Sequence, residues 1–328
     1  MGSIERVRGR TTLGIVAVAC AFALPATTAW AATATVGQLF VPNETSCSSN
    51  FTYLQIGVGS GASYVVPAAG VVTSWSFWDN AFVVPGLKLK VARDAQGLSY
   101  SIVGEATAGT QLPSTINAFS THIPVEAGDV IGIYEDGGGC GSNTTDPADV
   151  VVDVTGDQPL GTTAMFSGLS GSARFPVEAK VVLQPGVNSI SPAAGPTGGG
   201  AKVSFSGHDF SGATAVRFGA QPARTFTVES DSLISAVTPS ATAGTVDVTV
   251  TSPGGKSPTS LGDRFTFKTR CRVPKLKGKR LKSAKLALIR SLCRLGKVRG
   301  PRTGKVVHQS RKPGAHLPVG TKINIRLR

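Results

Sequence analysis

The chain is organised around a basic stretch that begins Cys271-Arg272-Val273-Pro274-Lys275-Leu276-Lys277-Gly278-Lys279-Arg280-Leu281. From Lys268 onward the sequence holds twenty Lys or Arg residues and no Asp or Glu. The rest of the 328-residue chain carries thirteen basic and nineteen acidic residues, so the whole net charge of +14 comes from this segment. Clustered positive charge raises the local concentration of anionic partners. The sequence therefore predicts a partner that carries many negative charges.

One helix and two strands are predicted within this basic segment. Four apolar residues recur at helical spacing, with Ile289 at the margin of their stripe: Leu281, Ala284, Leu288 and Leu292. Gly296 is the expected end of this helix, because glycine commonly terminates helices. The stretches Val306–Val307 and 322–327 predict strands that pack against the stripe. We therefore expect a small α+β unit over residues 268–328.

The same segment carries a specific order of turns and apolar positions. It includes Val273-Pro274-Lys275-Leu276-Lys277-Gly278, Leu295-Gly296-Lys297-Val298, Gln309-Ser310, Lys312-Pro313-Gly314 and Val319-Gly320-Thr321-Lys322-Ile323-Asn324-Ile325. This pattern resembles the PASTA domain over nearly the whole segment. PASTA domains are extracellular modules of penicillin-binding proteins and Ser/Thr kinases, associated with recognition of peptidoglycan or β-lactams. Because the chain has neither a kinase signature nor a Ser-x-x-Lys motif, the resemblance implies contact with the cell wall and not catalysis.

Two departures from the PASTA pattern add positive charge. Arg280 stands where the family often has Thr or Ser, so the helix lacks a side-chain N-cap and carries a cation at its positive end, which costs about 1 kcal/mol. Arg311 stands where the family commonly has Pro. The residues that we expect to contact the wall polymer are Lys275, Lys277, Lys279, Arg280, Lys282, Arg290, Arg311 and Lys312.

The first residues of the chain have the composition of an export signal. Three arginines precede an apolar run over residues 13–24, and small residues end at Ala31. The run is shorter than the roughly 20 residues that span a bilayer, and no later segment is long and apolar enough. We expect residues 1–31 to be a signal peptide and the mature protein to be secreted, extracellular or wall-associated, and not transmembrane. Lipoprotein processing at Cys20, within Ala17-Val18-Ala19-Cys20, is an alternative.

Four cysteines follow the signal segment: Cys47, Cys140, Cys271 and Cys293. Four cysteines allow three pairings. An oxidising destination and the clustering of the cysteines favour the pairs Cys47–Cys140 and Cys271–Cys293. Metal binding is not expected, because no Cys-x-x-Cys or His-x-x-His spacing occurs.

Residues 32–185 predict an all-β domain. Residues 87–91 alternate apolar and charged side chains, residues 150–154 and 177–183 are rich in β-branched side chains, and Gly or Pro turns recur between such stretches. We expect a two-sheet sandwich or jelly roll. The stretch 123–134 is similar to a corner of jelly-roll binding modules, and the domain resembles uncharacterised modules at the start of secreted actinobacterial proteins. Its ligand, a carbohydrate or a protein, is left open.

A metal site or a catalytic centre in this domain would depend on four carboxylates. Glu135, Asp136, Asp146 and Asp149 flank a glycine-rich loop, and such groups can bind calcium or hydrolyse glycosidic bonds. A solvated acidic loop is the favoured interpretation, so we assign no catalytic residue, metal ligand or cofactor. Four aromatic residues are expected in the core and not in a sugar-stacking platform: Trp75, Phe77, Trp78 and Phe82.

Residues 186–267 carry a second pattern with a family likeness. It includes Ile190-Ser191-Pro192, Gly195-Pro196-Thr197-Gly198-Gly199-Gly200, Phe205-Ser206-Gly207, Val216-Arg217-Phe218-Gly219 and Pro253-Gly254-Gly255. This pattern is similar to that of the IPT/TIG domain, which implies an immunoglobulin-like β-sandwich. In most extracellular members the family likeness implies a spacer or adhesion role.

Three functions are compatible with these features. The favoured one is an exported, non-enzymatic binding or adhesion protein whose PASTA-like unit docks on peptidoglycan or an anionic cell-wall polymer. A wall or polysaccharide-active enzyme with its site in residues 32–185 is one alternative. An extracellular nucleic-acid binder is the other, but such proteins stack bases on aromatic rings, and residues 271–328 contain no Phe, Tyr or Trp. We therefore expect no nucleic acid as a partner.

Overall fold

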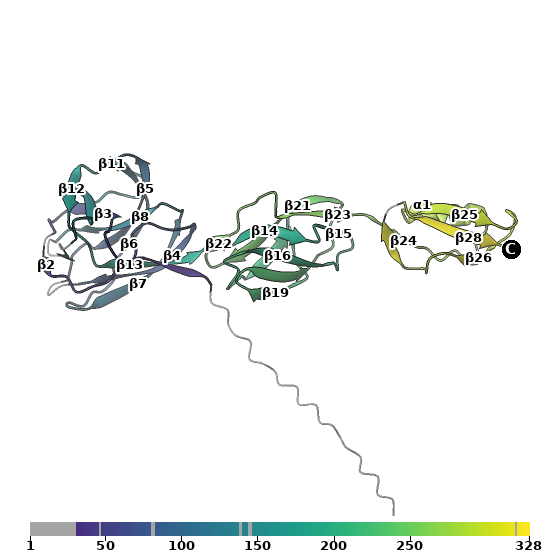
Figure 1. The fold of residues 1–328 in the computed structure, drawn as a ribbon, viewed down its shortest axis with the longest axis horizontal. Helices are drawn as coiled ribbons and strands as arrows, with labels where there is room; N and C mark the ends of the chain where they lie inside the picture. Colours follow the sequence, from purple (N-terminus) through teal and green to yellow (C-terminus); the bar gives the residue numbers. More distant parts are fainter. Residues whose placement is uncertain (1–30, 46, 80–82, 138–139, 144–145, 319) are drawn as a thin grey trace, which may run out of the picture.

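The structure, a computed structural model, describes residues 31–45, 47–79, 83–137, 140–143, 146–318 and 320–328. Three bodies follow one another along its long axis, and the C-terminus lies at one end (Figure 1). We call them the N-terminal sandwich (residues 33–183), the middle sandwich (186–268) and the C-terminal module (270–328). Most of the predicted signal segment, residues 1–30, lies outside the described residues. Among the residues described, no helix is long and apolar enough to cross a membrane.

The N-terminal sandwich is built from two facing sheets. Its strands are β1 (Thr33–Gly37), β2 (Glu44–Thr45), β3 (Phe51–Gly57), β4 (Gly70–Trp78), β5 (Lys88–Gln96), β6 (Ser99–Thr107), β7 (Ile116–Val125), β8 (Val130–Glu135), β9 (Gly141–Ser142), β10 (Val150–Thr155), β11 (Thr163–Met165), β12 (Gly168–Gly171) and β13 (Val177–Leu183). One sheet has the order β1-β13-β4-β7, the other has the order β11-β6-β5-β8-β3-β10-β12, and β2 pairs with β9. The predicted sandwich architecture is confirmed.

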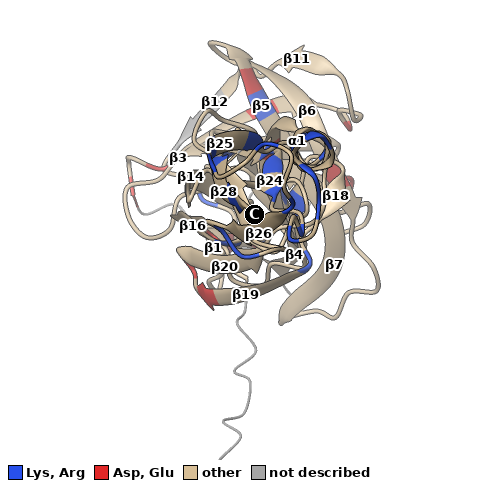
Figure 2. Cartoon of the chain, turned by 90° about the vertical axis from the view of Figure 1, so that its right-hand side faces the viewer, with Lys and Arg blue, Asp and Glu red and all other residues tan. Residues whose placement is uncertain are grey.

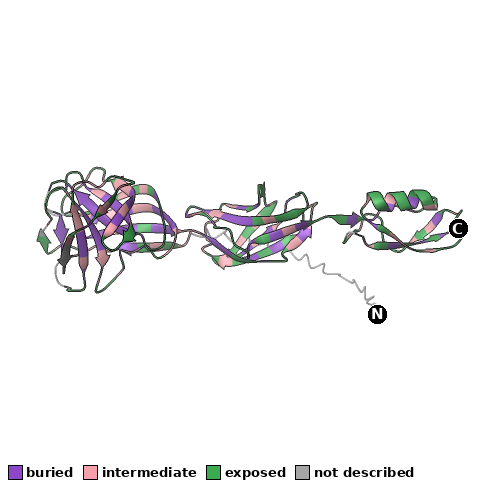
Figure 3. Cartoon of the chain, turned by 90° about the horizontal axis from the view of Figure 1, so that it is seen from above, coloured by how far each residue is buried: buried purple, intermediate pink, exposed green. Residues whose placement is uncertain are grey.

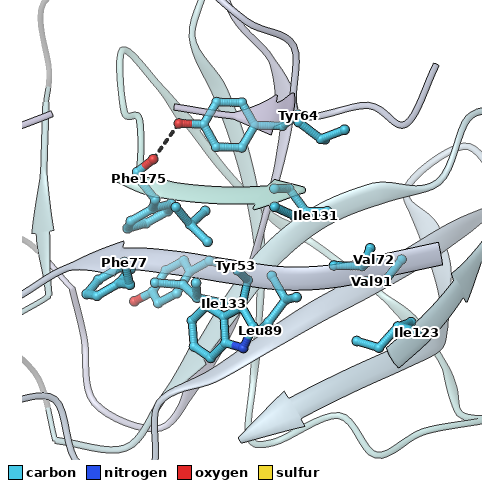
Figure 4. Close-up of a cluster of buried hydrophobic side chains, with 14 of the residues drawn as sticks. Tyr53, Tyr64, Val72, Phe77, Leu89, Val91, Ile123, Ile131, Ile133 and Phe175 are labelled. Atoms are coloured by element: carbon cyan, nitrogen blue, oxygen red, sulfur yellow. Dashed lines mark hydrogen bonds between the residues drawn. The ribbon is translucent and has the colours of Figure 1, made fainter. Parts of the chain in front are cut away.

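The core of this sandwich lies between the inner faces of the two sheets, as Figure 4 shows for the residues that it labels. In β4, Trp75 and Phe77 are both buried, which confirms their expected place in the core. Trp78 is only half-buried, and Phe82 lies outside the described residues. Fully burying one large apolar side chain contributes about 1.5–3 kcal/mol, so the alternation of apolar residues fixes which face of each strand turns inward.

One charged residue of β5 is buried where alternation predicts a solvent-exposed face. Lys90 has no exposed surface, and its ammonium group donates to Asp157 Oδ1 at 2.5 Å and to Glu105 Oε2 at 2.6 Å. Burial raises the pKa of Asp157, but the ammonium groups of Lys88 and Lys90 outweigh this effect and hold that pKa below its usual range. The segment after β10 therefore covers this part of the sheet and neutralises the buried cation.

The middle sandwich also has two sheets. Its strands are β14 (Gly186–Ser191), β15 (Ala194–Pro196), β16 (Lys202–His208), β17 (Ala215–Phe218), β18 (Gln221–Pro222), β19 (Thr225–Ser230), β20 (Leu233–Val237), β21 (Gly244–Ser252), β22 (Gly255–Lys256) and β23 (Arg264–Lys268). One sheet has the order β14-β16-β20-β19, and the other has the order β15-β23-β21-β17-β18, with β22 paired to β21. The phenylalanines at its centre are Phe205, Phe210, Phe218, Phe265 and Phe267, all buried. Gly199 and Gly200 both adopt positive φ angles, which allows the turn that the glycine run predicted.

A short linker connects the two sandwiches. The backbone N–H of Gln184 donates to the Ala69 carbonyl at 2.9 Å in the N-terminal sandwich. The side-chain amide of Gln184 donates to the Lys256 carbonyl at 2.6 Å in the middle sandwich. Gln184 therefore contacts both bodies at their junction.

The C-terminal module packs one helix against a small sheet. Its elements are β24 (Arg270–Arg272), α1 (Leu281–Arg290), β25 (Arg294–Arg299), β26 (Val306–Gln309), β27 (His316–Pro318) and β28 (Lys322–Leu327). The main sheet has the order β25-β28-β26, and β24 pairs with β27. Ala284 and Leu288 of α1 join Ile323 and Ile325 of β28 in the buried core. The predicted helix and both predicted strands are present, and Figure 3 shows α1 along one side of the module with the strands on the other.

The end of α1 differs from the prediction. The helix ends at Arg290, and Leu292 lies beyond it with a φ of 57° and 46% of its surface exposed. Gly296, the predicted helix end, lies inside β25. The backbone N–H of Cys293 donates to the Leu288 carbonyl at 2.9 Å, so the chain already turns away one residue after Leu292. This early turn brings Cys293 into the core.

Both predicted disulfides are present. Cys47 pairs with Cys140, with their Cα atoms 5.4 Å apart, and Cys271 pairs with Cys293, with their Cα atoms 4.7 Å apart. The second bridge joins β24 to the segment between α1 and β25, and both of its cysteines are buried. It therefore ties the start of the C-terminal module to the end of its helix.

Candidate functional site

The eight cations predicted to bind the wall are all exposed, but they come from three separate segments. Lys275, Lys277, Lys279 and Arg280 precede α1, Lys282 and Arg290 lie on it, and Arg311 and Lys312 follow β26. Arg280 is the N-cap residue of α1 and makes no side-chain capping hydrogen bond, as the sequence predicted. Figure 2 views the chain from this end and shows blue segments crowded around α1 and β24–β28. The predicted residues are therefore exposed and belong to the basic module at this end of the chain.

The described ion pairs all lie outside the C-terminal module. They connect residues between Lys88 and Arg264, within the two sandwiches. Since the module contains no Asp or Glu, its cations have no carboxylate side chain of their own module to pair with. Their positive charge is therefore available to an external anion.

A more compact group of cations lies on the open face of the β25-β28-β26 sheet. In β28 the residues Ile323, Ile325 and Leu327 turn toward α1 and are buried. The residues between them, Asn324 and Arg326, must then point to the other face, because side chains alternate along a strand. That face carries cations on neighbouring strands and no covering helix. We call it the open sheet face.

The strand register brings two of these cations and a histidine together. Arg299 of β25 and His308 of β26 are both paired with Arg326 of β28. Directly opposed residues on one sheet face have Cβ atoms about 4.5–5.5 Å apart, so the three side chains are neighbours. Lys297 lies two residues before Arg299 on the same strand, next to a register shift in the pairing of β25 with β28.

A hollow of about 420 Å³ lies over this face. It is lined by Lys297, Arg299, His308, Ser310, Asn324, Ile325 and Arg326. The backbone N–H of Asn324 donates to Ser310 Oγ at 2.9 Å, and the backbone N–H of Lys297 donates to Asn324 Oδ1 at 2.8 Å. These two bonds fix the polar floor of the hollow between strands that the sheet already holds in place. The result is a concave, basic site on three paired strands.

None of the residues that line this hollow was among the predicted wall contacts. The signal that could have found it is the alternation of the tail Lys322-Ile323-Asn324-Ile325-Arg326-Leu327-Arg328, which places its polar residues on one face. This alternation does not show which strand lies beside the tail, because β25 was not among the predicted strands. Only the pairing of β25 with β28 shows that Arg299 lies beside Arg326.

The carboxylates of the N-terminal sandwich make structural contacts. Asp149 is buried and accepts hydrogen bonds from Arg174 Nε at 2.9 Å and from the backbone N–H of Gly59 at 3.0 Å. Asp146 Oδ1 accepts from the backbone N–H of Ala148 at 3.0 Å. Among the described residues, no group of three or more His, Cys, Asp or Glu side chains could hold a metal ion. Asp149 and Glu135 are buried, so the predicted solvated acidic loop is wrong at these two positions, where the carboxylates accept hydrogen bonds from within the protein.

One buried carboxyl group in this sandwich has unusual electrostatics. Asp79 has no exposed surface, and burial raises its pKa to about 6. Its Oδ2 accepts from the Asn117 side-chain amide at 3.2 Å, while its Oδ1 finds no hydrogen-bond partner among the described residues. Because burial disfavours the charged form of this carboxyl group, its ionisation affects the stability of the fold.

Comparison with known proteins identifies two parts of the chain. Residues 185–267 match the family described as IPT/TIG domain, and residues 272–328 match the family described as PASTA domain, in the predicted middle and C-terminal positions. No curated protein matches the chain.

Solved structures give more distant likenesses. One is the full extracellular region of plexin A4, with 16% identity over 61% of this chain and a TM-score of 0.25. Another is SGBP-B from a complex xyloglucan utilization locus in Bacteroides uniformis, with 17% identity over 62% of this chain and a TM-score of 0.23. The matched regions span 17% and 49% of those two chains.

Proposed function

We propose that this chain, which carries an IPT/TIG domain followed by a PASTA domain, is an exported, cell-wall-associated binding protein. The basic C-terminal module docks on an anionic wall polymer or on peptidoglycan. The two sandwiches project from the docked end and are available for a carbohydrate or protein ligand. This proposal is supported by the kinds of domain present, since IPT/TIG and PASTA domains are binding or adhesion modules and not catalytic ones.

The observation that carries the proposal is the exposed and unneutralised charge of the C-terminal module. All twenty cations from Lys268 onward are exposed, and no acidic residue accompanies them. Residues 32–267 carry ten basic and eighteen acidic residues, a net charge of minus eight. An anionic surface therefore attracts one end of the chain and repels the rest.

The geometry supports binding better than catalysis in the N-terminal sandwich. A glycosidase needs two carboxyl groups that face a substrate cleft. Asp149 instead lies buried against Arg174, and Asp146 closes its own loop. The alternative of a nucleic-acid binder lacks the aromatic stacking residues that single-strand binders use.

The test is sedimentation with purified bacterial cell walls. The mature chain, residues 32–328, is compared with a chain that ends at Thr269, each at low and at high salt. The distance over which exposed charges act, the Debye length, falls from about 10 Å at 0.1 M salt to about 3 Å at 1 M. We expect the full mature chain to sediment at low salt and to be largely released at high salt. Equal sedimentation of the chain ending at Thr269 would contradict the proposed docking.

A further inference from the structure

The hollow over the open sheet face is lined mainly by hydrogen-bond donors, with His308 as a residue that can also accept. Arg299 and Arg326 present guanidinium groups, and Lys297 presents an ammonium group. Ser310 Oγ already accepts from the Asn324 backbone, so its hydroxyl hydrogen remains to be donated. The side-chain oxygen of Asn324 accepts from the Lys297 backbone N–H, and the NH₂ group of Asn324 is available as a donor.

This lining selects against a neutral glycan. Sugar hydroxyls both donate and accept hydrogen bonds, so a neutral sugar site needs acceptors, and carboxylates commonly supply them. The module has no Asp or Glu, and from Cys271 onward it has no Phe, Tyr or Trp on which a sugar ring could stack. A ligand group that only accepts hydrogen bonds and carries negative charge fits these donors. That group is an oxyanion.

The register of the strands adds an independent argument for a bound anion. Arg299 and Arg326 carry like charges and are paired across two neighbouring strands. Like charges directly opposite each other destabilise a sheet. No carboxylate of this module separates them. A bound anion would remove this repulsion, so its binding should also stabilise the module.

The number and placement of the donors favour phosphate over carboxylate. A single guanidinium group satisfies both oxygens of a flat carboxylate. Here donors from three strands surround one hollow, which suits a tetrahedral group whose oxygens point in several directions. Guanidinium groups match phosphate as well as they match carboxylate, and the site contains two of them.

We propose that the open sheet face is a phosphate-binding site for a linear phosphodiester polymer, with Arg299 and Arg326 as its central contacts. Lys297 and Ser310 supply further donors at its rim. This inference rests on the proposed wall docking and assigns the docking to one face of the module. The eight cations on the other segments then contribute long-range attraction and not specific contacts.

The experiment compares two variants that lose equal charge from the same module. The mature chain, residues 32–328, is titrated by calorimetry with poly(glycerol phosphate) at about 0.15 M salt, where charges more than about 8 Å apart are largely screened. R299Q/R326Q removes the two central arginines, and K282Q/R290Q removes two exposed cations of α1. We expect the first variant to bind about tenfold or more weakly, because each charge-assisted hydrogen bond contributes at least about a factor of ten. The second variant should lose less than about threefold, as expected for exposed and screened charges.

Polyglutamate serves as the carboxylate polymer, and we expect the mature chain to bind it more weakly than the phosphate polymer. Equal losses in the two variants would overturn the assignment of the site to the open sheet face. Equal binding of polyglutamate would overturn the assignment to phosphate. After either of these two results, the proposed wall docking is still supported if the mature chain sediments with walls at low salt and is released at high salt. Loss of that sedimentation overturns both. The melting temperature of each variant verifies that it is folded.

Discussion

Loss of the Cys271–Cys293 disulfide should strongly destabilise the C-terminal module while both sandwiches keep their stability. The two cysteines are 22 residues apart in the sequence, and closing a loop of this length stabilises a fold by about 3 kcal/mol in the chain-entropy account. A unit of about 60 residues has a total stability of about 3–9 kcal/mol. Three features place this module at the low end of that range: a small core, a helix without a side-chain cap, and many like charges. The bridge therefore supplies a large share of its stability.

Hydrogen exchange on the mature chain, residues 32–328, locates the effect within the molecule. In a C271S/C293S variant we expect the buried strand β28 to lose most of its protection, and the melting transition of the module to fall by about 20 °C, given about 4–8 °C per kcal/mol for a unit of this size. The control is C47S/C140S, whose loop is longer but whose sandwich has a much larger core. Its effect should stay within the N-terminal sandwich. Unchanged protection of β28 in the C271S/C293S variant would refute the reasoning.

Three further predictions concern stability. Burial raises the pKa of Asp79 from 3.8 to about 6, so the ionised form of Asp79 is disfavoured in the folded state. The N-terminal sandwich should therefore lose up to about 3 kcal/mol of stability as the pH rises from about 4 to above 6. A D79N variant should flatten this part of a stability-versus-pH curve. A K90A variant leaves the partly exposed carboxylates of Glu105 and Asp157 without their buried cation, so chemical denaturation should show a loss of about 2–4 kcal/mol, against less than about 0.5 kcal/mol for the exposed control K282A. An R280S variant gains an N-cap and removes a cation from the positive end of α1, so the melting temperature of the C-terminal module should rise in line with about 1 kcal/mol; an unchanged or lower value would contradict the role assigned to Arg280.

The sequence allowed the sheets to be predicted where burial follows a simple period. In β28 the apolar residues alternate, and the face they define is the face that is buried. The pattern failed at Lys90, which lies on the outward face of β5 and is nevertheless buried, because a segment more than sixty residues later folds over it. It failed again at Leu292, which continues the helical period although the helix has already ended. At Lys90 a tertiary contact outweighs the local period, and at Leu292 the turn that ends the helix does so.

The candidate site could be predicted only in part, for a related reason. Counting charges in the sequence locates the binding surface in the C-terminal module and gives its sign. It does not show which cations lie side by side. Arg299 and Arg326 are 27 residues apart and meet through a parallel pairing, which needs a crossover connection and leaves no short-range signal. Cations that share a loop are easy to group from the sequence, whereas cations that share a sheet face are not.

The position of the basic module gives the proposed docking a direction. The basic module lies at one end of an elongated chain, and the two sandwiches extend from it in a line (Figure 1). Residues 32–267 are negatively charged overall, so an anionic wall repels them while it attracts the module. Because one end is attracted and the rest is repelled, the long axis of the chain points away from the surface. This orientation needs no contact between the sandwiches and the wall. Under the proposed function, the ligand of the N-terminal sandwich must then be sought on the side that faces away from the wall, in the medium or on a neighbouring cell.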